Sequence, residues 1–187
     1  MRVIAGKARG TRLQSPQNMD IRPTSDRVKE SIFSILQNEL IDAVVVDLFS
    51  GTGNLGIESL SRGAKEAYFV DQSKASINII EYNLDKTRLK SQAKVIHTNA
   101  MAGIKLLAAK GIQANLIFVD PPYDHGLIEP VFNAIEAEKF LAVDGMVIVE
   151  HRRTALLPEA VGSLYLVRKK DYGNTSISFY QLREDKQ

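Results

Sequence analysis

Residues 117–123 join an apolar run to the tetrapeptide Asp120-Pro121-Pro122-Tyr123. The prolines lack an amide hydrogen and have a fixed φ, so a central strand must end before them. We therefore expect Asp120 at the carboxyl end of a buried strand, the edge where open α/β sheets bind ligands. A carboxylate, the Pro121 carbonyl and the Tyr123 ring in one small space would suit a flat base with an exocyclic amine. Taken alone, the tetrapeptide is more often a proline-rich turn with Tyr123 as a packing residue.

A glycine-rich segment earlier in the chain favours the ligand-binding interpretation of the tetrapeptide over a simple turn. Residues 44–48 begin with three valines and are expected to form a buried parallel strand, with the apolar pair Leu48-Phe49 following Asp47. Gly51, Gly53 and Gly56 follow with the G-x-G-x-x-G spacing, and a helix is expected to start at Asn54. Glycines let the backbone approach a ligand closely, although this spacing alone is a weak signal.

Two acids accompany the glycines. Asp47 precedes Gly51 by four residues, and Asp71 ends the predicted strand 67–71. An acid at Asp71 can accept hydrogen bonds from a ribose diol. A carboxylate at Asp47 would repel a pyrophosphate but attract a cation, such as the amino group and sulfonium of S-adenosylmethionine. The structural alternatives are that Asp47 caps the strand–loop junction and that Asp71 or Ser73 caps the next helix.

A third strand end supplies an amide. After the predicted strand 93–97, Asn99 and Ala100 lie where the adenine of such a cofactor would bind, and Asn99 could hydrogen-bond its amino group and ring nitrogen. Asn99 could equally cap the predicted helix 101–109, and the two roles are compatible.

Size and composition restrict the possible classes. The 187 residues, 44% of them hydrophobic, can bury one sizeable core, so we expect one main domain. The absence of cysteine excludes disulfides and thiolate metal sites, and His97, His125 and His151 lack ligand spacing, so we expect no metal. No apolar run approaches the roughly 20 residues that span a bilayer, and the N-terminus does not read as a secretory signal. We therefore expect a soluble cytoplasmic protein.

The net charge of +2 is unevenly distributed. Seven basic residues and two acids occur up to position 29: Arg2, Lys7, Arg9, Arg12, Arg22, Arg27 and Lys29 against Asp20 and Asp26. Such a run is usually a solvated face. Beside a base-binding site, the excess indicates an arm that contacts phosphates.

The arm belongs to a predicted N-terminal extension, residues 1–40, ahead of a catalytic domain over 41–187. Segments 3–6 and 11–13 suggest a small hairpin. Thr24 or Ser25 can cap a helix that runs to about Leu40. Its apolar face would comprise Val28, Ile32, Ile35 and Leu36.

Beyond the extension, strand and helix patterns alternate. The predicted strands are 44–48, 67–71, 93–97, 115–119 and 145–150, and the helices are 54–62, 74–89, 101–109 and 127–138. Alternation predicts a parallel sheet with helices on both faces. The short connection between 163–169 and 176–182 requires an antiparallel pair. The fold class expected is α/β, specifically the class I S-adenosylmethionine-dependent methyltransferase fold, which is Rossmann-like with a seven-stranded, mostly parallel sheet and an antiparallel C-terminal strand.

With these motifs placed, the chain resembles the bacterial RsmD-type 16S ribosomal RNA guanine-N2 methyltransferases over nearly its whole length. The most specific part of the resemblance is residues 22–33, Arg-Pro-Thr-Ser-Asp-Arg-Val-Lys-Glu-Ser-Ile-Phe. The opening 2–6 with Arg9-Gly10, the pattern over 47–56, Asn99-Ala100 and the terminal Phe179-Tyr180-Gln181 also look like that family. Thr52 and Asn54 are mild departures that leave the backbone role of the glycine loop intact.

The resemblance implies methylation, by S-adenosylmethionine, of the N2 amine of one guanine in 16S ribosomal RNA. The substrate would be the RNA, the small subunit or an assembly intermediate, and the protein a monomer without membrane association. The implied cofactor residues are Asp47, Phe49, Gly51, Gly53, Asp71, Asn99 and Ala100. The implied target-base residues are Asp120, Pro121, Pro122 and Tyr123. The implied RNA contacts are Arg2, Lys7, Arg9, Arg12, Arg22, Thr24 and Arg27.

Three other functions remain open. A DNA adenine-N6 methyltransferase shares every chemical motif but usually adds a target-recognition domain, for which only the first 40 residues leave room. A nicotinamide-dependent oxidoreductase is disfavoured by Asp47 and by the absence of a Tyr-x-x-x-Lys pattern. A non-catalytic RNA-binding module would not need an intact cofactor loop. Asp-Pro-Pro-Tyr fits both the N2 amine of guanine and the N6 amine of adenine, so the choice of guanine N2 rests on the N-terminal segment.

Overall fold

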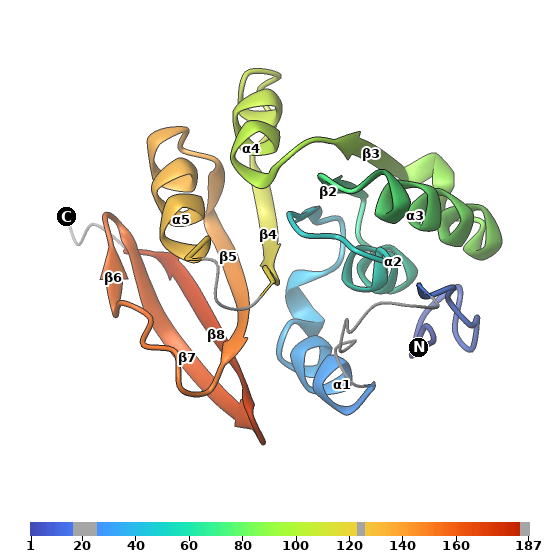
Figure 1. Cartoon of the computed structure of the whole chain (residues 1–187), viewed down its shortest axis with the longest axis horizontal. Coiled ribbons are helices and arrows are strands. Elements are labelled where there is room, and N and C mark those ends of the chain that lie inside the picture. The colour runs from blue at the N-terminus through green and yellow to red at the C-terminus, as the bar shows by residue number, and fades with distance from the viewer. Residues whose placement is uncertain (17–25, 123–125, 184–187) are drawn as a thin grey trace.

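The computed structural model describes residues 1–16, 26–122 and 126–183 and consists of one mixed sheet covered by helices (Figure 1). The strands are β1 (Val44–Asp47), β2 (Glu66–Asp71), β3 (Ala93–His97), β4 (Ala114–Val119), β5 (Leu141–Arg152), β6 (Ala160–Val161), β7 (Leu164–Tyr172) and β8 (Thr175–Leu182). The helices are α1 (Asp26–Ile35), α2 (Asn54–Ser61), α3 (Lys74–Thr87), α4 (Ala100–Ala108) and α5 (Ile128–Ala137), with short 3₁₀ turns η1 (Gln37–Glu39) and η2 (Lys90–Gln92).

The order of the strands confirms the predicted fold class. It is β3-β2-β1-β4-β5-β8-β7-β6, in which β1 to β5 are parallel and β8 lies antiparallel between β5 and β7. The chain order reverses between β1 and β4, and at such a switch point the loops after the two strands diverge and leave a crevice.

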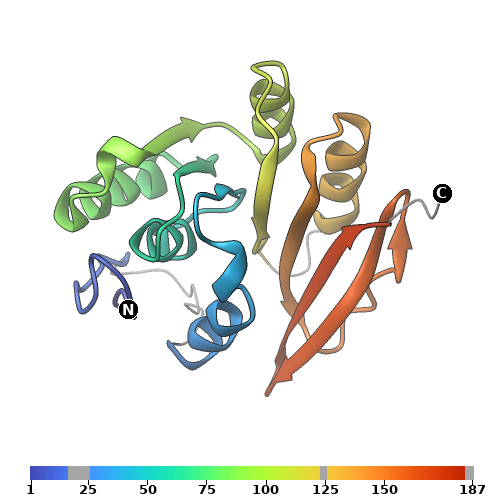
Figure 2. The same ribbon diagram turned by 180° about the vertical axis from the view of Figure 1, so that it is seen from behind.

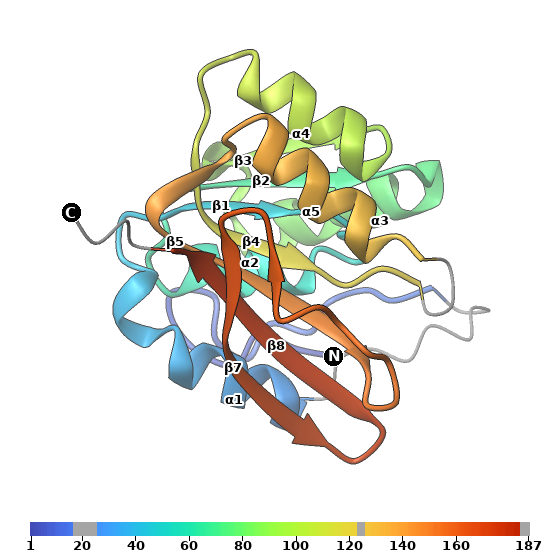
Figure 3. The same ribbon diagram turned by 90° about the vertical axis from the view of Figure 1, so that its left-hand side faces the viewer.

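Each face of the sheet has its own apolar core. One core joins α1, α2, α3 and the N-terminal segment to the sheet, and its Phe33 and Phe118 rings lie 5.9 Å apart. The other joins α4 and α5 to the opposite face, where Phe132 and Tyr180 meet edge to face at 4.7 Å. The end-on view in Figure 3 shows α4 and α5 on one side of the sheet and α1 on the other.

Strands β6 and β5 and helix α1 differ from the sequence expectation. The sheet has an eighth strand, β6, whose two residues are too few to produce a recognisable pattern. Strand β5 starts at Leu141, earlier than predicted, and its pairing with β4 shifts register between Ala114 and Leu116. Helix α1 ends at Ile35, and the chain continues through η1 to the buried Leu40 rather than as one helix.

The N-terminal segment forms the predicted turn-back, although its pairing is limited to one bridge between Arg2 and Arg12. Val3 N donates to Thr11 O at 3.0 Å, and Gly10 N donates to Val3 O at 2.8 Å. Val3 and Leu13 are buried in the same core as α1 and α2. In Figure 2 this dark blue segment lies against α2 and α3. Among the described helices, none has the length and hydrophobicity that crossing a membrane requires.

Candidate functional site

Four acids on neighbouring strands line the carboxyl edge of the sheet. Asp47 ends β1, Asp71 ends β2, Asp120 follows β4, and Glu150 lies near the end of β5. We call this set the acidic edge. The register brings its members together, because Asp47 is paired with Phe118, and Val119 is paired with Val149. The sequence-predicted Asp47, Asp71 and Asp120 therefore lie at one edge of the sheet, around the switch point.

The glycine loop crosses that switch point. Leu48 N donates to Phe118 O of β4 at 3.1 Å, and Ser50 N donates to Val70 O of β2 at 3.1 Å. The chain thus moves from one neighbour of β1 to the other within two residues. Gly53 then turns with φ +77° into α2, so its conformation favours glycine.

Gly56 has a packing role. A Cβ at this position would lie 2.4 Å from Cε1 of Phe69, a fully buried ring on β2. Only glycine therefore lets α2 pack this closely on the sheet, which is the role of the third glycine in the G-x-G-x-x-G pattern. This contact keeps the start of α2 beside Asp47.

Asp47 is the most deeply buried member of the acidic edge, with 2% of its surface exposed. Its Oδ2 accepts a hydrogen bond from Gly56 N at 3.3 Å, so it does stabilise the loop. Burial raises the pKa of Asp47 to about 7, and the nearby Asp71 adds to the rise, while the amides of Gly56 and Phe49 oppose it. A cation placed here would favour the ionised carboxylate.

Asp71 holds the other side of the loop. Its Oδ2 accepts from Gly51 N and its Oδ1 from Ser73 N, both at 2.8 Å. Ser73 is the residue that caps α3, because its Oγ accepts from Ser76 N at 3.4 Å. Each carboxylate oxygen can accept a further hydrogen bond, so these contacts are compatible with a diol ligand.

The remaining predicted cofactor residues surround the same edge. Asn99 caps α4 by accepting from Ala102 N at 2.9 Å, so the structural role considered for it is confirmed. Ala100 is buried, and the half-buried Phe49 packs on the core beneath α4 and α5. Thr98 N donates to Asp71 O at 3.0 Å, which keeps the end of β3 beside that acid.

Asp120, Pro121 and Pro122 are the described residues of the predicted target-base site. Asp120 is half-buried, Pro121 is buried and Pro122 is exposed. Burial raises the pKa of Asp120 well above its usual range, and the neighbouring Glu150 and Asp47 raise it further. Tyr123, predicted to stack on the base, lies outside the described residues.

Glu150 is not among the predicted site residues, because residues 145–150 were predicted only to form a strand. The signal was present, because Glu150 follows the apolar run Met146–Val149 just as Asp47, Asp71 and Asp120 follow theirs. Only 8% of its surface is exposed. The acid at the end of β5 therefore belongs to the site by position and by burial.

The predicted RNA-contacting residues are exposed where the structure describes them. Four are on the N-terminal turn-back and one is on the first turn of α1: Arg2, Lys7, Arg9, Arg12 and Arg27. We call these five the basic arm. Arg2 also forms an ion pair of 3.3 Å with Asp26. Arg22 and Thr24 lie outside the described residues.

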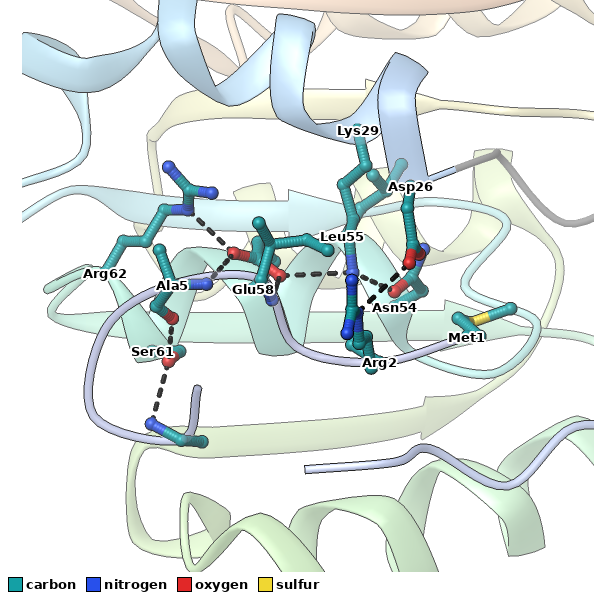
Figure 4. A network of polar contacts seen from close by, with 12 residues as sticks. Met1, Arg2, Ala5, Asp26, Lys29, Asn54, Leu55, Glu58, Ser61 and Arg62 are labelled. Atoms are coloured by element: carbon teal, nitrogen blue, oxygen red, sulfur yellow. Dashed lines mark hydrogen bonds and ion pairs between the residues drawn. The ribbon is translucent and has the colours of Figure 1, made fainter. Parts of the chain in front are cut away.

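Lys29, counted in the sequence among the basic residues of this segment, is instead a core residue. Its side chain is fully buried and reaches from α1 to α2, as Figure 4 shows. Its Nζ donates to Asn54 Oδ1 at 2.7 Å and pairs with Glu58 Oε2 at 3.1 Å. Burial lowers the pKa of Lys29, although Glu58 counteracts this. A lysine enclosed in this way cannot bind a phosphate, which corrects the charge-based interpretation at this position.

The same network docks the N-terminal turn-back, which carries four of the five residues of the basic arm, on α2, the helix that follows the glycine loop. Glu58 also accepts from Arg62 Nε at 2.8 Å and from the backbone amides of Ile4 and Ala5 at 2.8 and 3.0 Å. Ser61 Oγ donates to Ala5 O at 2.6 Å. The turn-back and the predicted cofactor loop therefore both adjoin α2.

Within the described ranges, no group of three or more potential ligand side chains could hold a metal ion. The arrangement instead offers a buried carboxylate suited to a cation, a second suited to a diol, and a third beside a proline carbonyl suited to an amine.

Comparisons with known proteins identify the relatives of the chain. A family model described as "Conserved hypothetical protein 95" matches residues 1–181. The chain is 36% identical to ribosomal RNA small subunit methyltransferase D of Escherichia coli, with 97% of this chain and 89% of that protein covered. It is 32% identical to the protein of the same name from Haemophilus influenzae, with coverages of 97% and 93%. The solved structure of yhhF from Escherichia coli superposes with a TM-score of 0.86 at 35% identity, over 98% of each chain.

Proposed function

Because the chain belongs to the family described as "Conserved hypothetical protein 95", the RsmD family, we propose that it transfers a methyl group from S-adenosylmethionine to the N2 amine of a guanine in small-subunit ribosomal RNA. The proposal includes a cytoplasmic, monomeric enzyme whose substrate is the RNA, the small subunit or an assembly intermediate. It extends to this chain the methylation of small-subunit ribosomal RNA that the relatives' names describe, and adds the methyl donor and the target amine.

The observation that carries the proposal is the position of Asp120 and Pro121 directly across the switch point from Asp47. Asp47 and Asp71 favour a ligand with a cation and a ribose, because a buried carboxylate at the glycine loop opposes a pyrophosphate. When bound, S-adenosylmethionine supplies a methyl group activated by its sulfonium and keeps the electron pair of the broken C–S bond. Asp120 and Pro121, the residues that would hold the acceptor amine, directly follow the neighbouring strand β4.

The chain's own residues would bind the acceptor amine and stabilise its charge during methyl transfer. Its lone pair is delocalised into the purine, so positive charge develops on nitrogen as the new C–N bond forms. The Asp120 carboxylate and the Pro121 carbonyl would accept hydrogen bonds from the two N–H groups of the amine and stabilise that charge where it develops. The methylated nitrogen must lose one proton, and the raised pKa of Asp120 suits it to accept that proton.

RNA binding is assigned to the basic arm together with Arg22 and Thr24. The arm is exposed, and its support α2 begins at the glycine loop, so phosphates bound there would lie at a fixed position relative to the cofactor. The relatives named for ribosomal RNA favour this substrate over a DNA adenine.

Cofactor binding provides the first prediction. Asp71→Ala should weaken the binding of S-adenosylmethionine, measured by calorimetry, by about 1–3 kcal/mol, because a charge-assisted hydrogen bond to the ribose is lost. Asp71→Asn is the matched control, since it keeps one acceptor for Gly51 N and should lose less affinity. The wild-type protein should not bind NADH, and NADH binding without sulfonium binding would refute the cofactor assignment.

RNA binding provides the second. The affinity for small-subunit RNA should fall with salt by about 0.7–0.9 decades per decade of salt for each phosphate contact. Arg9→Ala with Arg12→Ala should flatten this slope by up to about two units and leave cofactor affinity unchanged. The control pair is Lys105→Ala with Lys110→Ala, two exposed lysines, one within α4 and one just after it. An unchanged slope in the arginine double variant would reduce the arm to a solvated surface.

Methyl transfer itself is tested with RNA that lacks the modification. Small-subunit RNA and particles from an Escherichia coli strain without its methyltransferase D should accept label from tritiated S-adenosylmethionine. The same material from the parent strain is the matched control and should accept almost none. The proposed substrate would be contradicted if RNA from the two strains were labelled equally, or if neither were labelled.

A further inference from the structure

Asp120, directly after β4, and Glu150, within β5, each follow one member of a residue pair on adjacent strands. Val119 of β4 is paired with Val149 of β5, and each acid is the next residue in its chain. Parallel neighbours are about 4.8 Å apart, so the two carboxyl groups begin one strand spacing from each other. The effect of Glu150 on the pKa of Asp120 agrees with this proximity.

The two acids also belong to the same face of the sheet. Side chains alternate along a strand, so Asp120 follows the direction of Phe118, and Glu150 follows that of Ile148. Phe118 and Ile148 are paired with each other and lie in the core beneath α1. Asp47 shares this face, since it is paired with Phe118 and its carboxylate contacts α2.

A base whose amine is held by Asp120 would therefore have Glu150 beside the next position along its edge. On guanine that position is N1–H, a donor directly adjacent to the N2 amine. On adenine the atom adjacent to the N6 amine is an unprotonated N1, which carries a lone pair. A buried carboxylate attracts a donor and repels a lone pair.

We propose that Glu150 is the specificity-determining residue for the target base. Its carboxylate would accept a hydrogen bond from the guanine N1–H, beside the amine held by Asp120. This proposal rests on the proposed guanine-N2 function. Two neighbouring carboxylates then meet two neighbouring donors. The order of these groups on the sheet, Asp47, Asp120 and Glu150, places the methyl donor, the amine and N1–H along one line of strands, β1, β4 and β5. Glu150 would thus distinguish guanine from adenine, which Asp-Pro-Pro-Tyr alone does not do.

The test replaces the target guanine of a synthetic RNA with 2-aminopurine, which keeps the 2-amine but has an unprotonated N1. The wild-type enzyme should prefer guanine by about 100-fold or more in kcat/KM, because a site built for a donor rejects the analogue lacking it. In Glu150→Gln the amide can turn to accept from guanine or donate to 2-aminopurine. The preference should therefore narrow by about 10-fold or more.

Two variants separate this role from a structural one. Glu159→Gln makes the same chemical change at an exposed position and should keep the full preference. Glu150→Asp keeps the charge and should lower the rate while retaining the preference for guanine. Thermal melting of each variant verifies its fold before kinetics are compared.

The pH profile gives an independent readout. Removing the charge of Glu150 should lower the pKa of Asp120, since Glu150 raises it. The acidic limb of the rate of guanine methylation should therefore move to lower pH in Glu150→Gln, whereas Glu159→Gln should leave it in place.

An unchanged preference between guanine and 2-aminopurine in folded Glu150→Gln would overturn the role of Glu150 and leave guanine-N2 methylation standing. A wild-type enzyme that methylates adenine and not guanine would overturn the proposed function as well. The two failures are thus distinguishable in one set of reactions.

Discussion

Asp120→Ala is expected to lower the single-turnover rate of methyl transfer by on the order of 10²–10³, the loss typical of one preorganised electrostatic partner. The reason is positional, because Asp120 comes directly after β4 and across the switch point from Asp47, where positive charge would develop on the amine. Affinity for S-adenosylmethionine should change little, since the predicted ribose contact is Asp71 on β2. Rapid-quench measurements with saturating cofactor and RNA provide the rate.

The pH dependence of the same reaction has a defined sign. The ionised form of Asp120 accepts both the hydrogen bond from the amine N–H and, later, the proton, and burial has raised the pKa of Asp120. The rate should therefore rise with pH through that raised pKa and then level off. Asp120→Asn retains an acceptor oxygen but cannot ionise, so it should be less impaired than the alanine variant and should lack this limb. An unaffected rate in Asp120→Ala would return the residue to a structural role at the strand end.

Lys29→Met should lower the free energy of unfolding by about 3–5 kcal/mol, as expected when one partner of a buried ion pair is removed. Glu58 would remain fully buried, with Arg62 and two backbone amides as its partners (Figure 4). Asn54 would lose the donor that ties the start of α2 to α1. Urea denaturation monitored by circular dichroism measures the change.

Lys105→Met is the matched control for this stability effect. Lys105 is an exposed lysine within α4, and its replacement should stay within about 0.5 kcal/mol of the wild type. If Lys29→Met proved as mild as this control, the Lys29–Glu58 pair would contribute nothing to docking the arm on α2.

The site could be predicted from sequence where local rules were sufficient. Asp47, Asp71 and Asp120 each end an apolar run, and the carboxyl ends of parallel strands share one edge, so their convergence required no knowledge of register. Gly56 was identified by spacing, and the structure adds the reason, its close approach to Phe69.

Other features depend on pairings between distant segments. Lys29 and Glu58 are both charged residues in helical segments, and nothing local indicates that they face each other in the core. The placement of Glu150 beside Asp120 depends on a β4–β5 register that includes a shift between Ala114 and Leu116. For this reason the charge count placed Lys29 on the surface, and Glu150 was predicted only as part of a strand and not as a site residue.

The identity of the methylated nucleoside tests guanine-N2 methylation most directly. Small-subunit RNA lacking the modification would be treated with the enzyme and S-adenosylmethionine, digested to nucleosides and separated by chromatography with mass detection. We predict N2-methylguanosine as the single new product. It should be absent when Asp120→Ala replaces the wild type and the reaction is stopped at times that suffice for one turnover of the wild-type enzyme. N6-methyladenosine in its place would contradict both the choice of base and the role given to Glu150.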